Sequence, residues 1–193
     1  ASALGARAQG AWPAKPVRIV VGFAAGGTTD IVARLMAKEL TEALGQPFIV
    51  DNKPGAGSNI ATDVVRTADP DGYTLLMMAV TSTINQTLYS NIKFKLDRDF
   101  DGVALCAKMP NILVVNPNVP AKTVPEFIAW LKTQGDKVSY ASSGSGTSIH
   151  MAGELFKVRT GTQAVHVPYK GSAPALTDLM GGQVQYMFDN MIS

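Results

Sequence analysis

Two loops rich in glycine and hydroxyl side chains carry the chemistry that this sequence offers. One reads GFAAGGTTD over residues 22–30, and the other reads SSGSGTS over residues 142–148. Glycine lets the backbone come close to a ligand, and the first N–H groups of a helix lack partners within that helix. A loop of this kind that leads into a helix favours an anion, held by N–H and hydroxyl groups without a buried cation. Together the two loops predict a clamp for a small carboxylate.

The candidate ligand-binding residues come from these loops and from the ends of other predicted strands. They are Phe23, Ala25, Gly26, Gly27, Thr28, Asp30, Asn52, Thr81, Ser142, Ser145, Gly146, Thr147, Ser148, His150 and Asp189. Three of them have a second interpretation that the sequence leaves open. Asn52 equally suits a turn, His150 suits packing or helix capping, and Asp189 suits capping of the loop that follows it.

Nucleotide binding is disfavoured by what these glycine loops lack. Residues 22–29 have the spacing of a P-loop, but Thr28 stands where the phosphate-binding lysine would be. The glycine pairs at 55–57 and 144–146 have no third glycine to complete a dinucleotide fingerprint. The loops therefore predict an anion smaller than a nucleotide.

Serine hydrolysis is the enzymatic alternative. Residues 146–150 read GTSIH, which lacks the second glycine of a nucleophile elbow. A serine and a histidine two residues apart on a helix do not face each other. Ser148 or Ser145 would need His166 and Asp189 from elsewhere in the fold to form a triad. We therefore expect no catalytic residue.

The composition excludes several other classes of function. A net charge of +2 without a run of Lys or Arg argues against a nucleic-acid partner. No apolar stretch approaches the roughly 20 residues of a membrane span. Two histidines and one cysteine predict no metal site, and we expect no cofactor. The cysteine, Cys106, lies in the apolar context VALCAKM, which favours a buried, inert thiol.

Strand, loop and helix follow one another three times in the first part of the chain. Apolar runs predict strands at 17–22, 48–50 and 74–80, and a helix over 30–44 with Thr28 or Thr29 as its cap. This order is typical of a parallel sheet with helices on its faces, where ligands bind beyond the carboxyl ends of the strands. Each glycine or hydroxyl loop falls at such an end.

The second part of the chain repeats this order. We predict strands at 112–115, 138–141, 164–167 and 184–188, and a helix that begins at a capping box of Thr123 and Glu126. The proline-marked residues 116–120 are the expected crossing between lobes. We therefore divide the chain into a leader remnant or disordered terminus at 1–12, a first α/β lobe at 13–115 and a second at 116–193.

Six segments, taken in order, resemble the Bug-type extracytoplasmic solute receptors, the binding proteins of tripartite tricarboxylate transporters. They are WPAKPVRIVV at 12–21, FAAGGTTD at 23–30, DNKPGAG at 51–57, DPDGYTL at 69–75, YASSGSGT at 140–147 and HVPYKGSAPA at 166–175.

The resemblance implies two Rossmann-like α/β lobes of the periplasmic-binding-protein type, with the ligand in the cleft between them. It implies a dicarboxylate, tricarboxylate, acidic amino acid or aromatic acid as ligand, and integral membrane transporter subunits as partners. The ligand carboxylate would meet residues 23–30 and 142–148, partly through ordered waters. The protein would be periplasmic, secreted through a signal peptide that is mostly absent from this chain.

Two further expectations follow from the resemblance. Members of the family are longer, and the additional part normally returns to the first lobe, so we expect the first lobe of this chain to be incomplete. A sensor that passes its bound state to a membrane signalling partner is an alternative that the sequence does not separate from transport.

Overall fold

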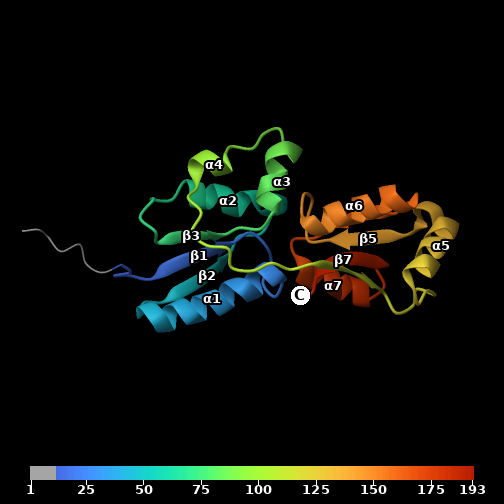
Figure 1. The fold of residues 1–193 in the computed structure, drawn as a ribbon, viewed down its shortest axis with the longest axis horizontal. Helices are drawn as coiled ribbons and strands as arrows, with labels where there is room; N and C mark the ends of the chain where they lie inside the picture. Colours follow the sequence, from blue (N-terminus) through green and yellow to red (C-terminus); the bar gives the residue numbers. More distant parts are fainter. Residues whose placement is uncertain (1–11) are drawn as a thin grey trace, which may run out of the picture.

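The computed structural model describes residues 12–193, which form two α/β lobes along the long axis of the molecule (Figure 1). Residues 1–11 of the predicted leader lie outside the described part. Trp12 packs edge-on against Phe48, with ring centroids 6.2 Å apart. No helix within residues 12–193 has the length and hydropathy needed to cross a membrane.

The first lobe is built on three parallel strands in the order β2-β1-β3, which confirms the predicted parallel sheet. The buried residues of the central strand β1 are all apolar, and three of them, Val17, Val20 and Val21, are fully buried. In Figure 1, α1 covers one face of the sheet, while α2 and α3 lie on the other. The elements are β1 (Val17–Val21), α1 (Thr28–Leu44), β2 (Phe48–Asn52), η1 (Ala56–Ser58), α2 (Asn59–Arg66), β3 (Thr74–Met77), α3 (Thr81–Leu88) and α4 (Leu96–Asp99).

Helix α1 begins two residues earlier than predicted. Its N-cap is Gly27, in extended backbone and without a side-chain cap, so Thr28 and Thr29 lie inside the first turn and do not cap it. The helix ends at Gly45, as predicted, where a φ of 72° gives the left-handed conformation that glycine adopts easily.

The second lobe contains a four-stranded sheet in the order β4-β7-β5-β6. Strands β5, β6 and β7 are parallel, whereas β4 runs antiparallel to β7. The capping box of Thr123 and Glu126 is present at the start of α5. The elements are β4 (Asn111–Val115), α5 (Val124–Gln134), η2 (Gly135–Lys137), β5 (Ser139–Ser142), α6 (Ser148–Thr160), β6 (Val165–Pro168), α7 (Ser172–Met180) and β7 (Tyr186–Asn190).

The strand predicted to end the first lobe belongs to the second sheet. Strand β4 pairs along its whole length with β7, from Asn111 opposite Asn190 to Val115 opposite Tyr186. The crossing therefore lies before β4, in the irregular residues 100–110, and not at the prolines of 116–120. Those prolines mark the turn between β4 and α5, where Asn116 donates to the carbonyl of Leu179 at 2.6 Å.

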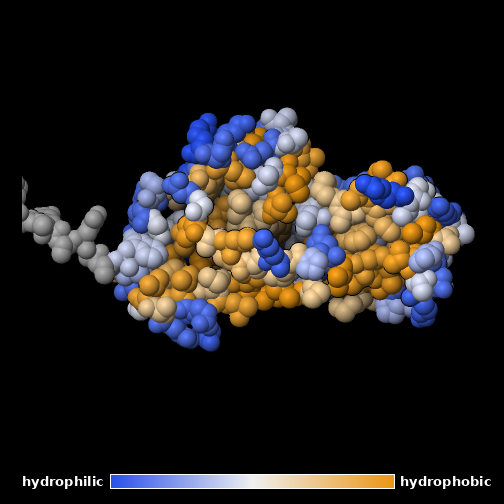
Figure 2. All heavy atoms as spheres, in the orientation of Figure 1, coloured by the Kyte–Doolittle hydropathy of each residue, from blue (hydrophilic) through white to orange (hydrophobic). Residues whose placement is uncertain are grey.

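The crossing segment is exposed, which corrects the prediction for Cys106. The thiol of Cys106 faces solvent, and its neighbours Val103 and Leu105 are 85% and 72% exposed. In Figure 2, hydrophobic residues dominate the face around this segment, whereas hydrophilic residues gather over α4. An apolar local context thus did not bring burial, because no element of the described chain covers this segment.

Candidate functional site

The two lobes meet through the loops at the carboxyl ends of their parallel strands. The N–H of Ala24, in the loop after β1, donates to the carbonyl of Lys170, which follows β6, at 2.8 Å. A side-chain carbon added at Gly57 would lie only 2.4 Å from the carbonyl oxygen of Ser145. Glycine is therefore required for this approach, and the predicted convergence of loops from both lobes is what the structure shows.

A cleft of about 180 Å³ lies between these loops. This volume is below the roughly 300–1,000 Å³ typical of pockets for drug-sized ligands, so the cleft suits a small solute. Its lining residues are Gly22, Phe23, Gly55, Ala56, Gly57, Ser58, Tyr89, Ser143, Gly144, Ser145, Pro168, Tyr169 and Lys170.

Two of the residues predicted from sequence, Phe23 and Ser145, line this cleft. The others are not among the residues that line it. They are Ala25, Gly26, Gly27, Thr28, Asp30, Asn52, Thr81, Ser142, Gly146, Thr147, Ser148, His150 and Asp189. Hydrogen bonds show the contacts that several of these residues make within the protein.

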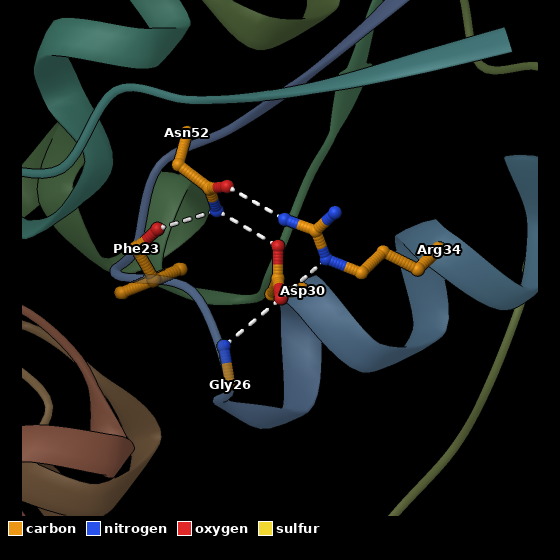
Figure 3. Close-up of polar contacts among 5 residues, drawn as sticks. All are labelled: Phe23, Gly26, Asp30, Arg34 and Asn52. Atoms are coloured by element: carbon orange, nitrogen blue, oxygen red, sulfur yellow. Dashed lines mark hydrogen bonds and ion pairs between the residues drawn. The ribbon is translucent and has the colours of Figure 1, made fainter.

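Asp30 braces the first loop from inside the protein (Figure 3). Its carboxylate is 2% exposed and accepts the N–H of Gly26 at 2.9 Å, Arg34 Nε at 2.8 Å and Asn52 Nδ2 at 2.9 Å. Burial alone would raise the pKa of Asp30, but these hydrogen bonds outweigh it and hold the pKa below its usual value. The carboxylate is therefore ionised and fully engaged.

Asn52 completes this brace at the end of β2. Its Nδ2 also donates to the carbonyl of Phe23 at 3.0 Å, and its Oδ1 accepts Arg34 Nη2 at 3.1 Å. These contacts use both ends of the side-chain amide. Asn52 thus ties the cleft residue Phe23 to the buried carboxylate of Asp30.

The second loop is fixed by a separate set of hydrogen bonds. Thr147 caps α6 by accepting the N–H of His150 at 3.2 Å, and its hydroxyl donates to the carbonyl of Gly144 at 2.7 Å. The ring of His150 accepts the N–H of Gly146 through Nδ1 at 3.2 Å. Thr147 and His150 therefore hold the backbone that presents Gly144 and Ser145 to the cleft.

The two histidines of the chain stack on each other behind this loop, with ring centroids 4.0 Å apart. Burial lowers the pKa of His150. Burial and the adjacent His150 together lower the pKa of His166 to about 4. His166 Nε2 lies 2.6 Å from the hydroxyl of Ser142, which is fully buried. The pair is neutral near pH 7 and forms part of the support of the loop.

Asp189 and Thr81 are buried and are not among the residues that line the cleft. Asp189 is the penultimate residue of β7 and accepts the hydroxyl of Ser172 at 2.7 Å, and burial raises the pKa of Asp189. Thr81 begins α3 and is 2% exposed. Gly27 lies against the start of α7, where a side-chain carbon would be 3.5 Å from the backbone nitrogen of Ser172.

The sequence reasoning missed several residues of the cleft wall. The glycine loop at 55–58 and the segment at 168–170 stood out as motifs, but neither was assigned to the site. Their position after β2 and β6 was the signal that would have found them, because both follow strands of a parallel sheet. Tyr89 follows α3 and carried no such signal.

The fold is the two-lobed α/β fold of periplasmic binding proteins. The chain belongs to the tripartite tricarboxylate transporter family of receptors, whose characteristic sequence matches residues 32–193.

Three solved structures show how close this similarity is. The periplasmic binding protein BugD is 36% identical and superposes with a TM-score of 0.91, covering 94% of this chain and 61% of that one. R. palustris Rpa4515 with adipate is 38% identical, with a TM-score of 0.90 and coverage of 93% and 60%. MatC from Rhodopseudomonas palustris with bound malate is 35% identical, with a TM-score of 0.85 and coverage of 93% and 61%.

The chain spans little more than half the length of the curated relatives it matches. Relatives that are 36–38% identical to it have 53–58% of their own length covered. The family and the structural neighbours are solute-binding receptors and not enzymes, which argues against serine hydrolysis.

Proposed function

We propose that this protein is a periplasmic receptor that captures a small organic carboxylate between its two lobes and delivers it to integral membrane transporter subunits. The observation that carries the proposal is the cleft formed where glycine and serine loops from both lobes converge. Each loop follows a strand of a parallel sheet, the position at which α/β folds bind ligands.

The charge of the cleft favours an anion. No acidic side chain is among the described residues that line it, and the one charged residue among them is a lysine, Lys170. The serines at 58, 143 and 145 add hydroxyl donors, and the glycines leave the backbone N–H groups accessible. Asp30, the nearby acidic residue of the first loop, is ionised, but its charge is balanced by Arg34 and it accepts further hydrogen bonds from Gly26 and Asn52.

The arrangement of the lobes supports capture by closure. They are joined by the irregular segment at 100–110 and touch through the loops that line the cleft. A ligand that contacts both loops stabilises the closed state relative to the open one, and a membrane partner can read that difference.

The ligand class follows from the chemistry of the wall and from the neighbours. A wall of hydroxyls, N–H groups and one lysine recognises carboxylates, and two neighbours were solved with the dicarboxylates adipate and malate. We place dicarboxylates first, with tricarboxylates, acidic amino acids and aromatic acids as the other members of the class to be tested.

A thermal-shift titration of the purified protein tests this function. Adipate, malate, citrate, glutamate and benzoate are compared with dimethyl adipate, which has the same carbon chain without the charges. At a concentration 100 times its Kd, a ligand stabilises the native state by about 2.7 kcal/mol, so at least one acid raises Tm while the ester does not. An unchanged Tm with every acid would contradict the proposal.

A further inference from the structure

Ser58 occupies an unusual position on the first-lobe side of the cleft. It directly precedes α2, and its φ of 71° places it in the left-handed region that favours glycine. It is 2% exposed and nevertheless belongs to the wall of the cleft. Its position is therefore both buried in the lobe and part of the wall of the cleft.

The hydroxyl of Ser58 makes no hydrogen bond to any described residue. It does not cap α2, because no side-chain cap bond exists at that helix start. It points toward Gly22, where an added side-chain carbon would lie only 1.8 Å from Ser58 Oγ. Gly22 also lines the cleft, and its lack of a side chain leaves room for this hydroxyl, whose oxygen has almost no accessible surface.

A purely structural role does not account for serine at this position. Glycine adopts a positive φ at lower cost than serine does, and the preceding residues, from Gly55 to Gly57, already have positive φ values. A buried hydroxyl without a partner also carries a desolvation cost. Ser58 therefore carries two energetic costs, the positive φ and the unpartnered hydroxyl, without capping the helix. Both costs are explained if the hydroxyl binds a ligand in the cleft.

The surroundings of Ser58 suit a carboxylate oxygen. The start of α2 contributes partial positive charge, as helix N-termini do. Across the cleft, the loop of the second lobe is near, since a side-chain carbon at Gly144 would lie 3.8 Å from Gly57 Cα. A carboxylate at this point would contact both lobes.

We propose that Ser58 binds the ligand directly, donating its hydroxyl hydrogen to a carboxylate oxygen at the first-lobe side of the cleft. The inference rests on the proposed function and assigns a donor to it that neither the motifs nor the predicted site contained. Ser58 is thus a specificity residue, since an ester or amide in place of the carboxylate gains less from this hydrogen bond.

Two substitutions of the same residue separate ligand contact from structure. Ser58→Ala and Ser58→Gly both remove the hydroxyl, but only glycine relieves the positive φ, so their Tm values diverge. If the hydroxyl binds the carboxylate, both variants raise the Kd of the best acid in the panel about 10- to 100-fold, as expected for a lost hydrogen bond to a charged group. Ser82→Ala is the matched control, because Ser82 is a fully buried serine of the same lobe outside the cleft wall.

The outcomes distinguish this inference from the proposed function. Wild-type affinity in both Ser58 variants would overturn the role of Ser58 while leaving carboxylate binding intact. Weak binding by Ser58→Ala with full recovery in Ser58→Gly would also overturn it, because affinity would then follow backbone strain. A wild-type protein that binds no carboxylate would overturn the proposed function and this inference with it.

Discussion

Asn52 donates a hydrogen bond to Asp30 at 2.9 Å, joining the end of β2 to the first turn of α1. The same amide nitrogen holds the carbonyl of Phe23, which belongs to the cleft wall. Two residues predicted as ligand contacts therefore fix the shape of the first loop of the cleft, and neither is among the residues that line it.

The brace predicts that Asn52→Ala destabilises the protein. Without the amide, the buried Asp30 loses a donor and the Phe23 carbonyl loses its partner, which costs about 1–3 kcal/mol of unfolding free energy. Arg34→Ala is the comparison, and we expect a smaller loss because Arg34 is 54% exposed and its ion pair is screened. Urea denaturation measures both, and a larger loss for Arg34→Ala would contradict this ranking.

Close approach of the lobes at Gly57 predicts that Gly57→Ala prevents full closure. The added carbon would meet the Ser145 carbonyl at 2.4 Å, so the lobes must separate. We expect at least a tenfold weaker affinity for the panel acid that binds the wild-type protein most tightly, and a larger radius of gyration by X-ray scattering in the presence of that acid.

Gly45→Ala is the control for backbone strain at a positive φ. Gly45 has a φ of 72°, and an added carbon there meets nothing within 4 Å. This variant should lose about 1 kcal/mol of stability without any change in affinity. Equal affinity losses in the two glycine variants would show that strain, and not contact between lobes, controls binding.

The buried histidine pair predicts that stability falls on acidification. Burial and the adjacent His150 lower the pKa of His166 to about 4, against 6.5 for an unperturbed histidine. The unfolded state binds more protons between these values, so the stabilisation is complete above pH 6.5 and is lost as the pH falls toward 4. His166 contributes at most about 1.4 kcal/mol per pH unit to the slope of the unfolding free energy against pH.

Comparison with His166→Gln isolates this effect. Glutamine does not titrate, so the unfolding free energy of the variant should rise less steeply between pH 4.5 and 6.5 than that of the wild type. Measured by chemical denaturation, the total rise over this window should be smaller in the variant by on the order of 1 kcal/mol. The raised pKa of Asp189 acts in the opposite direction but is common to both proteins and cancels in the difference. Identical slopes would show that His166 titrates normally in the folded state.

The cation in the cleft predicts a salt-dependent contribution to affinity. Lys170 lines the cleft, so Lys170→Gln should weaken binding of the tightest-binding panel acid severalfold at low ionic strength and reduce its salt dependence. Lys132→Gln is matched in charge change and is exposed on α5, away from the cleft. Calorimetric titrations at low and high salt measure this, and similar effects of both substitutions would mean that Lys170 acts only through net charge.

Local patterns were sufficient to predict most of the fold. Continuous apolar runs located β1 and β2, and the Thr123 capping box located the start of α5, because these signals depend on neighbours in the chain. Strand β4 was found but assigned to the wrong lobe. Its antiparallel partner β7 lies more than 70 residues away, and nothing local specifies that pairing.

The site was predicted only to the level of its loops. Hydroxyl and glycine residues identified the regions around Phe23 and Ser145, yet the sequence does not tell which polar groups turn inward. Thr147 and Asp30 satisfy the backbone of their own loops, whereas Ser58 reaches the cleft through a left-handed backbone that composition does not reveal. Tertiary hydrogen bonding therefore decides which predicted residues remain free for a ligand.

The most direct test of the central claim is isothermal titration calorimetry of the wild-type protein with adipate and malate, alongside dimethyl adipate. The account predicts saturable binding of one carboxylate per protein for at least one diacid, with no measurable heat for the ester. No binding of either diacid, or equal binding of the ester, would contradict a carboxylate clamp between the lobes.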